Sequence, residues 1–375
     1  MSGPAFVAVG SNETRAFGLP AVERARRFAA KAGLTPSDDL PAAGGAILAN
    51  LAFAWDPAWL RHLEQEPGLV VTLGGEVVLA HAGDAASARM IAGAMTAGEG
   101  LPPGSASRVI AAETGATLYN HALRKRETLY VLPLTPQTRT AVEKASYDGA
   151  YKGVTDLLTL YLWRGAAFHL TRWAAAAGMT PNMVTAMGAV FCLAAFACFW
   201  QGYYWAGVAT GLVFMVLDTV DGKLARCTGT SSKWGNIFDH GIDQIHPPFW
   251  WWSWAHGLAF HVGLADDGRW PALWVILVGY VVQRLTEGAF MRLFGGMHIH
   301  TWRPVDSRFR LVTARRNPNM VILFASLLLG RPDWGLFAVA WWTAISCVFH
   351  LVRLVQAMAA RSQGRQVTSW LSEAA

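Results

Sequence analysis

Hydrophobic residues are distributed very unevenly along the chain. Residues 173–217 contain no Lys, Arg, Asp or Glu, and further uncharged runs follow at 244–265, 270–283, 317–330 and 334–352. A helix that crosses a bilayer needs about 20 mostly apolar residues. The pattern therefore predicts an α-helical integral membrane bundle of six transmembrane helices, at about 183–202, 204–226, 233–262, 270–293, 314–330 and 334–358.

The first 150 residues have a different pattern. Residues 5–9 are typical of a short apolar strand, residues 20–32 of a helix, and residues 68–80 of a hairpin across Gly74-Gly75. This region predicts a small α/β domain. The N-terminus lacks the basic and long apolar regions of a signal peptide, so we expect the domain to stay in the cytoplasm.

A linker joins these two regions. In residues 151–179, apolar positions alternate with Arg164, His169 and Arg172, which is typical of an amphipathic helix in the membrane interface. The predicted organisation is a cytoplasmic α/β domain at 1–140, a linker with an interfacial helix at 141–180, a six-helix membrane domain at 181–360, and a tail at 361–375.

Composition and charge agree with a membrane protein. The chain is 53% hydrophobic and only 15% charged, which excludes intrinsic disorder. Its net charge of +6 comes largely from basic residues in loops on the side of the α/β domain, whereas the opposite loops contain only Arg269 and Arg331. By the positive-inside rule, this asymmetry predicts a multi-pass protein of the inner, cytoplasmic membrane with the N-terminal domain in the cytoplasm. It also explains the basic charge without a nucleic-acid partner.

The segment 218–243, DTVDGKLARCTGTSSKWGNIFDHGID, contains the candidate chemistry. Asp218 and Asp221 are three residues apart, and Asp239 and Asp243 are four apart, so each pair shares one helix face. Two neighbouring helices joined by a short turn would bring all four carboxylates to the same depth. Four converging carboxylates inside a membrane protein need compensating charge, which predicts one or two Mg²⁺ or Mn²⁺ ions, two being expected.

Small and basic residues accompany these aspartates. Gly222 and Gly235 allow close approach to the backbone, and Arg226 can hold a phosphate with its bidentate guanidinium. The pattern Asp218-x2-Asp221-Gly222-x2-Ala225-Arg226-x8-Gly235-x3-Asp239-x3-Asp243 resembles the signature of the CDP-alcohol phosphotransferases. The resemblance covers about residues 150–360.

The resemblance implies an activity and a set of roles. A CDP-alcohol, for example CDP-diacylglycerol, would transfer its phospho-alcohol group to an acceptor alcohol in phospholipid or related biosynthesis, and CMP would leave. Asp218, Asp221 and Asp239 would bind the metal ions, with Asp243 as general base and partial ligand. Family members are typically homodimers. The residues expected to contact the CDP-alcohol are Asn182, Thr185, Asp218, Gly222, Arg226 and Ser232.

The loop at 295–319 is long and basic. Its arginines, expected to bind an anionic acceptor such as a phosphorylated polyol, are Arg303, Arg308, Arg310, Arg315 and Arg316. Membrane topology and contact with lipid headgroups explain the same charges equally well. Arg284 and Glu287 are three residues apart within the predicted fourth span, which predicts an ion pair that faces the interior of the bundle.

Several alternatives remain open at the level of sequence. Acidic residues in spans also occur in cation transporters, and a metal-dependent membrane phosphatase could use the same ions. The N-terminal region resembles the nucleotidyltransferase domain of bifunctional family members. However, Gly10 stands alone where a glycine-rich loop is expected, so we predict a degenerate, noncatalytic domain. The sequence does not name the donor or the acceptor.

Overall fold

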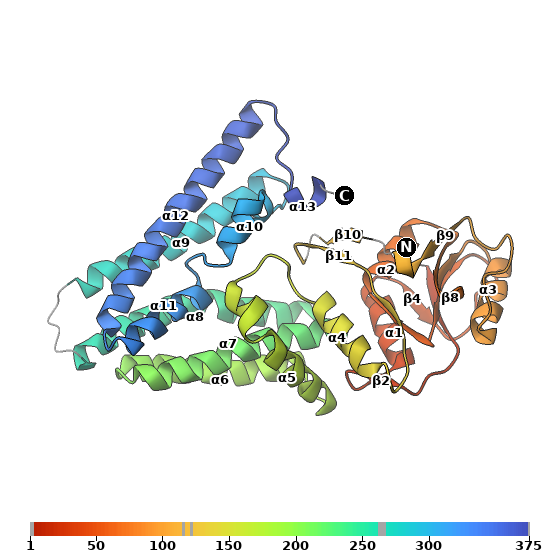
Figure 1. The fold of residues 1–375 in the computed structure, drawn as a ribbon, viewed down its shortest axis with the longest axis horizontal. Coiled ribbons are helices and arrows are strands. Elements are labelled where there is room, and N and C mark those ends of the chain that lie inside the picture. Colours follow the sequence, from red (N-terminus) through yellow and green to blue (C-terminus); the bar gives the residue numbers. More distant parts are fainter. Residues whose placement is uncertain (1–3, 115–116, 121–122, 262–267, 374–375) are drawn as a thin grey trace.

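The computed structural model describes residues 4–114, 117–120, 123–261 and 268–373. It places an α/β domain at one end of an elongated helical region (Figure 1). The main sheet has the strand order β4-β1-β5-β8-β7-β9. Its strands are β1 (Ala5–Val9), β4 (Thr35–Ser37), β5 (Ala46–Asn50), β7 (Leu69–Leu73), β8 (Glu76–Ala82) and β9 (Arg108–Ala111).

The sheet mixes parallel and antiparallel pairs. Strand β1 runs parallel to β4 and β5, while β8 runs antiparallel to β5 and β7. The predicted strand at 5–9 and the predicted hairpin are both confirmed. Gly74 and Gly75 form the hairpin turn with φ values of +60° and +87°, a conformation that side chains other than glycine rarely adopt.

Helices cover both faces of the sheet. Phe6 and Ile47 pack with Trp55 and Trp59 on one face, whereas alternate strand residues form a second core on the other. The helices are α1 (Ala21–Lys31), α2 (Ala58–Gln65) and α3 (Ala85–Ala97). Short two-stranded pairs are β2 (Arg15–Ala16) with β3 (Leu19–Pro20), β6 (Phe53–Trp55) with β12 (Val131–Pro133), and β10 (Thr117–Asn120) with β11 (Lys125–Thr128). The predicted helix at 20–32 corresponds to α1.

The linker contains α4 (Arg139–Gly149), a π-helical turn η2 (Leu158–Leu162) and α5 (Arg164–Ala176). The predicted amphipathic helix is thus divided at Trp163, whose indole Nε1 donates to Thr219 Oγ1 across 3.1 Å. Helix α5 buries Phe168 and Thr171 and exposes Trp173, so its two faces differ in burial. This arrangement ties the linker to the membrane-facing helices.

A helix lies at each of the six ranges predicted to span the membrane. These are α6 (Pro181–Trp200), α7 (Tyr204–Cys227), α8 (Lys233–His261), α9 (Arg269–Leu293), α11 (Arg316–Leu328) and α12 (Pro332–Ser362). Within the described part of the chain, α6, α9 and α12 are long and apolar enough to cross a membrane. The predicted third span also includes residue 262, which lies outside the described residues. Shorter helices are η3 (Ile299–Thr301), α10 (Pro304–Arg310) and α13 (Trp370–Glu373).

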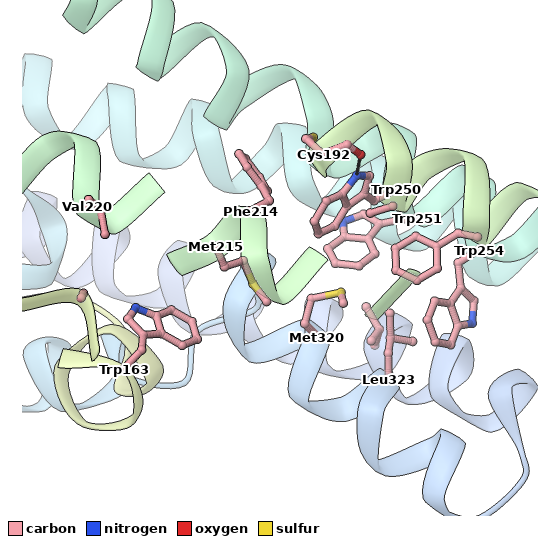
Figure 2. Packing of buried hydrophobic residues seen from close by; sticks show 14 of the residues in the cluster. Trp163, Cys192, Phe214, Met215, Val220, Trp250, Trp251, Trp254, Met320 and Leu323 are labelled. Carbon is pink, nitrogen blue, oxygen red and sulfur yellow. Dashed lines mark hydrogen bonds between the residues drawn. The ribbon is translucent and has the colours of Figure 1, made fainter. Parts of the chain in front are cut away.

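Aromatic side chains hold α6, α7 and α8 together (Figure 2). Trp250 of α8 is buried against Phe214 of α7, and its Nε1 donates to the backbone oxygen of Cys192 on α6 across 3.0 Å. That bond satisfies a polar group that would otherwise be costly to bury. Gly211 allows this contact, since a Cβ there would lie 3.1 Å from the Trp250 ring. The packing sets the relative positions of the two helices that carry the acidic motif.

The α/β domain docks on the linker and on the end of α7. The backbone nitrogen of Phe17 donates to Glu143 Oε1 across 2.9 Å, and Arg172 pairs with Glu143 Oε2 at 2.6 Å. Lys223 Nζ donates to the backbone oxygen of Ala150 in the linker across 3.0 Å, and a Cβ on Gly229, just after α7, would lie 3.3 Å from Phe28 of α1. The domain therefore meets the helical region at the end of α7 that contains the acidic motif.

Candidate active site

The predicted convergence of aspartates is present for three of the four. Asp218 comes from α7, and Asp239 and Asp243 come from α8, on either side of the α7–α8 turn. One carboxylate oxygen from each of the three lies within 4.8 Å of the others. Helix α6 packs against both α7 and α8 and so supports the arrangement. We call these three residues the aspartate cluster.

Arg316 bridges this cluster from the start of α11. Its Nη2 lies 2.6 Å from Asp218 Oδ2, and its Nη1 lies 2.8 Å from Asp243 Oδ1. The guanidinium also lies over the ring of Phe214, 5.0 Å from the centroid. A single half-buried cation thus offsets part of the repulsion between two carboxylates.

Asp221 has different partners. Its side chain is buried, Oδ2 accepts a hydrogen bond of 2.6 Å from Thr185 Oγ1, and Oδ1 accepts one from the backbone nitrogen of Gly222. Thr185 lies in the first turns of α6, where Thr180 caps the helix and Pro181 occupies its first position. Thr185 therefore orients the carboxylate of Asp221 beside the cluster.

The two glycines of the motif leave room for polar side chains. A Cβ on Gly235 would lie 2.8 Å from Asn182 Oδ1 and 3.0 Å from Ser232 Oγ, so glycine lets these two exposed residues meet. A Cβ on Gly222 would lie 3.1 Å from Arg226 Nη2. The residues predicted to contact the CDP-alcohol are thus gathered around the α7–α8 turn.

The chemistry of the aspartate cluster fits a divalent cation. Oxygen ligands of Mg²⁺ lie about 2.0–2.1 Å from the ion, so two ligands of one ion are at most about 4.2 Å apart. Oxygens already within 4.8 Å of one another need only small side-chain rotations to meet this limit. Asp239 and Asp243 keep 28% and 42% of their side-chain surface exposed, so an ion can reach them.

A basic pocket adjoins Asp243. It has a volume of about 110 Å³ and includes three of the five predicted acceptor residues, Arg310, Arg315 and Arg316. Arg310 is buried, and among the described residues its Nε and Nη1 have no hydrogen-bond partner. The remaining lining residues are Asp156, Asp243, Pro247, Tyr280, Arg284, Asn317 and Pro318. We call this the arginine pocket.

The other two predicted arginines lie elsewhere. Arg303 stacks on Trp302 at 4.7 Å, and Arg308 is exposed on α10; neither lines the arginine pocket. Conversely, sequence reasoning interpreted Arg284 only as the partner of Glu287. That ion pair is confirmed at 3.1 Å, and Arg284 also lines the pocket.

A buried polar network supports the arginine pocket and was missed from the sequence. Glu287 accepts bonds from Arg315 Nη2 at 2.5 Å and lies 3.3 Å from His300 Nε2. Glu287, His300 and His350 each place a possible ligand atom within 4.8 Å of the others. Because two arginines already neutralise Glu287, this group suits an ion-pair network better than a metal site.

Two linker residues were also missed. Asp156 Oδ1 accepts a bond of 3.0 Å from Asn317 Nδ2, which joins the linker to α11 across 161 positions of sequence. Burial and the charges of Arg124 and Arg226 lower the pKa of Lys152 to about 8. No local pattern marks either residue, because their roles depend on segments far away in the chain.

Residues 178–300 match the CDP-alcohol phosphatidyltransferase family. This matched segment lies within the helical half of the chain. The match contains every aspartate of the motif, and it begins after the α/β domain. The comparisons support no identity for that N-terminal domain.

The chain is also similar to individual proteins. The chain is 28% identical to archaetidylinositol phosphate synthase of Pyrococcus horikoshii, over 47% of this chain and 85% of the relative. It is 32% identical to cholinephosphotransferase 1 of Gallus gallus, over 31% of this chain and 37% of that protein. A crystal structure of Mycobacterium tuberculosis phosphatidylinositol phosphate synthase with manganese and citrate matches 50% of this chain and 88% of that chain, with 20% identity and a TM-score of 0.41.

Proposed function

We propose that the chain transfers the phospho-alcohol group of a CDP-alcohol to an acceptor alcohol and releases CMP. The observation that carries this proposal is the aspartate cluster of Asp218, Asp239 and Asp243, which lies inside the segment that matches the CDP-alcohol phosphatidyltransferase family. The acidic residues gather beside one turn instead of forming a path along the bundle. This position favours a transferase over a cation transporter.

The four aspartates have distinct roles in this proposal. Asp218, Asp221, Asp239 and Asp243 hold two Mg²⁺ or Mn²⁺ ions, which when bound neutralise the diphosphate and the leaving CMP. Asp243 is the general base and accepts the proton of the acceptor hydroxyl. It suits this task because it is the most exposed member of the cluster and also lines the arginine pocket.

The donor is held around the α7–α8 turn. Asn182 and Ser232 contact the CDP group beside Gly235, and Arg226 binds a phosphate above Gly222. Thr185 acts by orienting Asp221. Each of these contacts comes from a residue of the motif or from the head of α6.

The acceptor is a phosphorylated polyol bound in the arginine pocket. Arg284 and Arg315 pair with Glu287, and Arg316 pairs with Asp218 and Asp243, but Arg310 lines the pocket with Nε and Nη1 that have no partner among the described residues. These free N–H donors favour an anion. One relative is named archaetidylinositol phosphate synthase, and inositol phosphate is a phosphorylated polyol, in agreement with this choice. Because such an acceptor is soluble, a lipid product requires a lipid donor, for which we propose CDP-diacylglycerol.

The membrane arrangement follows from the same reasoning. We propose that α6, α7, α8, α9, α11 and α12 all span the bilayer of the inner membrane, with the active site and the α/β domain in the cytoplasm and two chains forming a homodimer. The α/β domain has no catalytic role of its own in this proposal. Its position beside the end of α7 gives it a supporting role at the active site.

Acceptor-dependent CMP release tests the function. Purified protein in lipid nanodiscs with Mg²⁺ is offered CDP-diacylglycerol and soluble CDP-polyols, each with and without inositol phosphate, glycerol phosphate or inositol. We expect CMP only when a donor and an acceptor are both present. Release of CMP or phosphate without an acceptor would instead identify a hydrolase, and cation flux without CMP release would identify a transporter.

A further inference from the structure

A second and larger cavity lies between the α/β domain and the helical region. It has a volume of about 300 Å³, and we call it the inter-domain pocket. Its walls come from the end of α1, the start of α2, the segment from β10 to β12, the end of α4 and the α7–α8 turn. The family match does not account for it, because most of its residues precede position 178, although it shares Arg226 with the proposed donor site.

Three cations line the inter-domain pocket without a counter-ion. Among the described residues, Lys31, Arg61 and Arg226 have no carboxylate within ion-pair distance. Within the described part of the chain, the hydrogen bond of the Arg226 side chain is from Nε to the backbone oxygen of Ala150 at 3.0 Å. Partial desolvation, followed by the nearby charge of Arg226, lowers the pKa of Lys31, although Lys31 keeps much of its surface exposed. Like charges that face each other in this way favour an anion between them.

Neighbouring basic residues have more partners within the protein. Arg24 donates to Tyr130 Oη at 2.8 Å and to the backbone oxygen of Trp55, although its Nε has no partner among the described residues. Lys125 pairs at 2.7 Å with Glu127, which also lines the pocket. The carboxylate of Glu127 is therefore already paired and does not compensate Lys31, Arg61 or Arg226.

The remaining walls suit the rest of a nucleotide. Phe28, Pro57 and Leu123 provide apolar surface on which a base or ribose can pack. Asp56 is buried, and its Oδ1 accepts a bond from the backbone nitrogen of Ala58 at 2.9 Å. Its second oxygen can accept a bond from an amino group. A volume of about 300 Å³ is at the lower end for small-molecule sites, which fits a mononucleotide.

We propose that the inter-domain pocket binds a nucleoside phosphate, with the phosphate held by Lys31, Arg61 and Arg226. Arg226 and Ser231 connect the pocket to the α7–α8 turn, so a bound nucleotide touches both halves of the chain. The choice of a cytidine nucleotide rests on the proposed function, whereas the phosphate site rests on the unpaired cations. The nucleotide is either the CDP group of the donor or a separate nucleotide.

Direct binding of CMP to the full chain tests the proposal. Calorimetric titration compares the wild type with Lys31→Ala and Arg61→Ala, and Arg89→Ala is the control because Arg89 is exposed on α3 and does not line the pocket. Since Lys31 and Arg61 are exposed, we expect the variants to fold, and equal melting temperatures verify this. Each pocket variant should weaken CMP binding about tenfold or more, the usual effect of losing a charge-assisted bond. Unchanged binding in both variants overturns the proposal, as does the absence of CMP binding to the wild type.

Competition with the donor identifies the source of the nucleotide. The experiment uses Asp243→Asn, which we expect to bind CDP-diacylglycerol without turning it over. Displacement of CMP by CDP-diacylglycerol assigns the pocket to the CDP group of the donor, and simultaneous binding assigns it to a separate nucleotide. If no CDP-alcohol is turned over by the wild type but CMP binding still depends on Lys31, the proposed function fails while the pocket assignment stands.

Discussion

Arg316 Nη1 lies 2.8 Å from Asp243 Oδ1, a contact that joins the first residue of α11 to a residue 73 positions earlier on α8. Because Arg316 also lines the arginine pocket, one side chain connects the proposed acceptor site to the aspartate cluster. An anion bound in the arginine pocket therefore competes with Asp243 for the same guanidinium. Acceptor binding in the arginine pocket would therefore change how strongly Arg316 pairs with Asp243, the proposed general base.

Replacing the general base tests its role directly. Asp243→Asn should lower kcat by about 10²- to 10⁴-fold, the usual contribution of a positioned base. Donor affinity should change little, because Asn keeps the shape of the side chain. CMP release and CDP-alcohol binding are measured on the same preparation. Asp39→Asn, an exposed residue of the α/β domain, is the control, and normal turnover by Asp243→Asn would refute the assignment.

The arginine pocket predicts an effect on the acceptor alone. Arg310→Gln should raise the acceptor KM about tenfold or more and leave the donor KM unchanged, because it removes a buried group with free N–H donors. Arg308→Gln is the matched control, since Arg308 is exposed on α10 outside the pocket. Equal effects of the two variants would favour a topological role for these charges.

Removing Arg316 should strengthen metal binding. The side chain shares oxygens of Asp218 and Asp243 with any bound cation, and its positive charge repels a divalent ion. Without substrates, Arg316→Gln should bind Mn²⁺ at least about tenfold more tightly, since repulsion across a few ångströms exceeds about 1.4 kcal/mol even in water. Mn²⁺ titration followed by electron paramagnetic resonance measures this. Asp239→Asn should weaken Mn²⁺ binding. Weaker Mn²⁺ binding by Arg316→Gln would contradict the idea that Arg316 and the metal ion share the oxygens of Asp218 and Asp243.

Two glycines of α8 provide a matched pair. Gly235→Ala would place a methyl group 2.8 Å from Asn182 Oδ1 and 3.0 Å from Ser232 Oγ, so we expect the donor KM to rise severalfold as these residues move apart. Gly241→Ala lies in open space on the same helix and should leave the donor KM unchanged. Both changes favour the helix to a similar extent. Steady-state kinetics with varied CDP-alcohol distinguishes the two variants.

Asp56 predicts a pH-dependent stability. Burial raises its pKa to about 6, above the value of 3.8 for a free carboxyl group, so the folded chain binds the proton more tightly than the unfolded chain does. The contribution of Asp56 to the free energy of unfolding should therefore be up to about 3 kcal/mol larger below pH 4 than above pH 6, and it should be lost as the pH rises between these values. Asp56→Asn, whose side-chain oxygen can still accept from Ala58, should raise the melting temperature at pH 7.5 more than at pH 4.5. Asp39→Asn is again the control, and an equal shift at both pH values would argue against a raised pKa.

The local parts of the site could be predicted from the sequence. Asp218, Asp239 and Asp243 were expected to meet because their spacing places each pair on one helix face beside a short turn. The hairpin at Gly74-Gly75 and the helices at the six predicted ranges follow equally from local patterns. The arginine pocket could be predicted only in part. Three of the five expected arginines line it, and Arg284, which also lines it, was expected only to form an ion pair.

The sequence by itself determined where the six C-terminal helices, the first strand and helix and the hairpin at Gly74-Gly75 lie, and which half of the chain has the acidic motif. Hydrophobic runs, turn residues and motif spacing act over a few residues, so they can be interpreted without coordinates. Only the tertiary structure decided which distant side chains meet, such as Arg316 with Asp218 and Asn317 with Asp156. It also placed the unpaired cations of the α/β domain against Arg226. These contacts depend on how the aromatic core sets the packing of α6, α7 and α8, and on where the α/β domain docks, which no local pattern specifies.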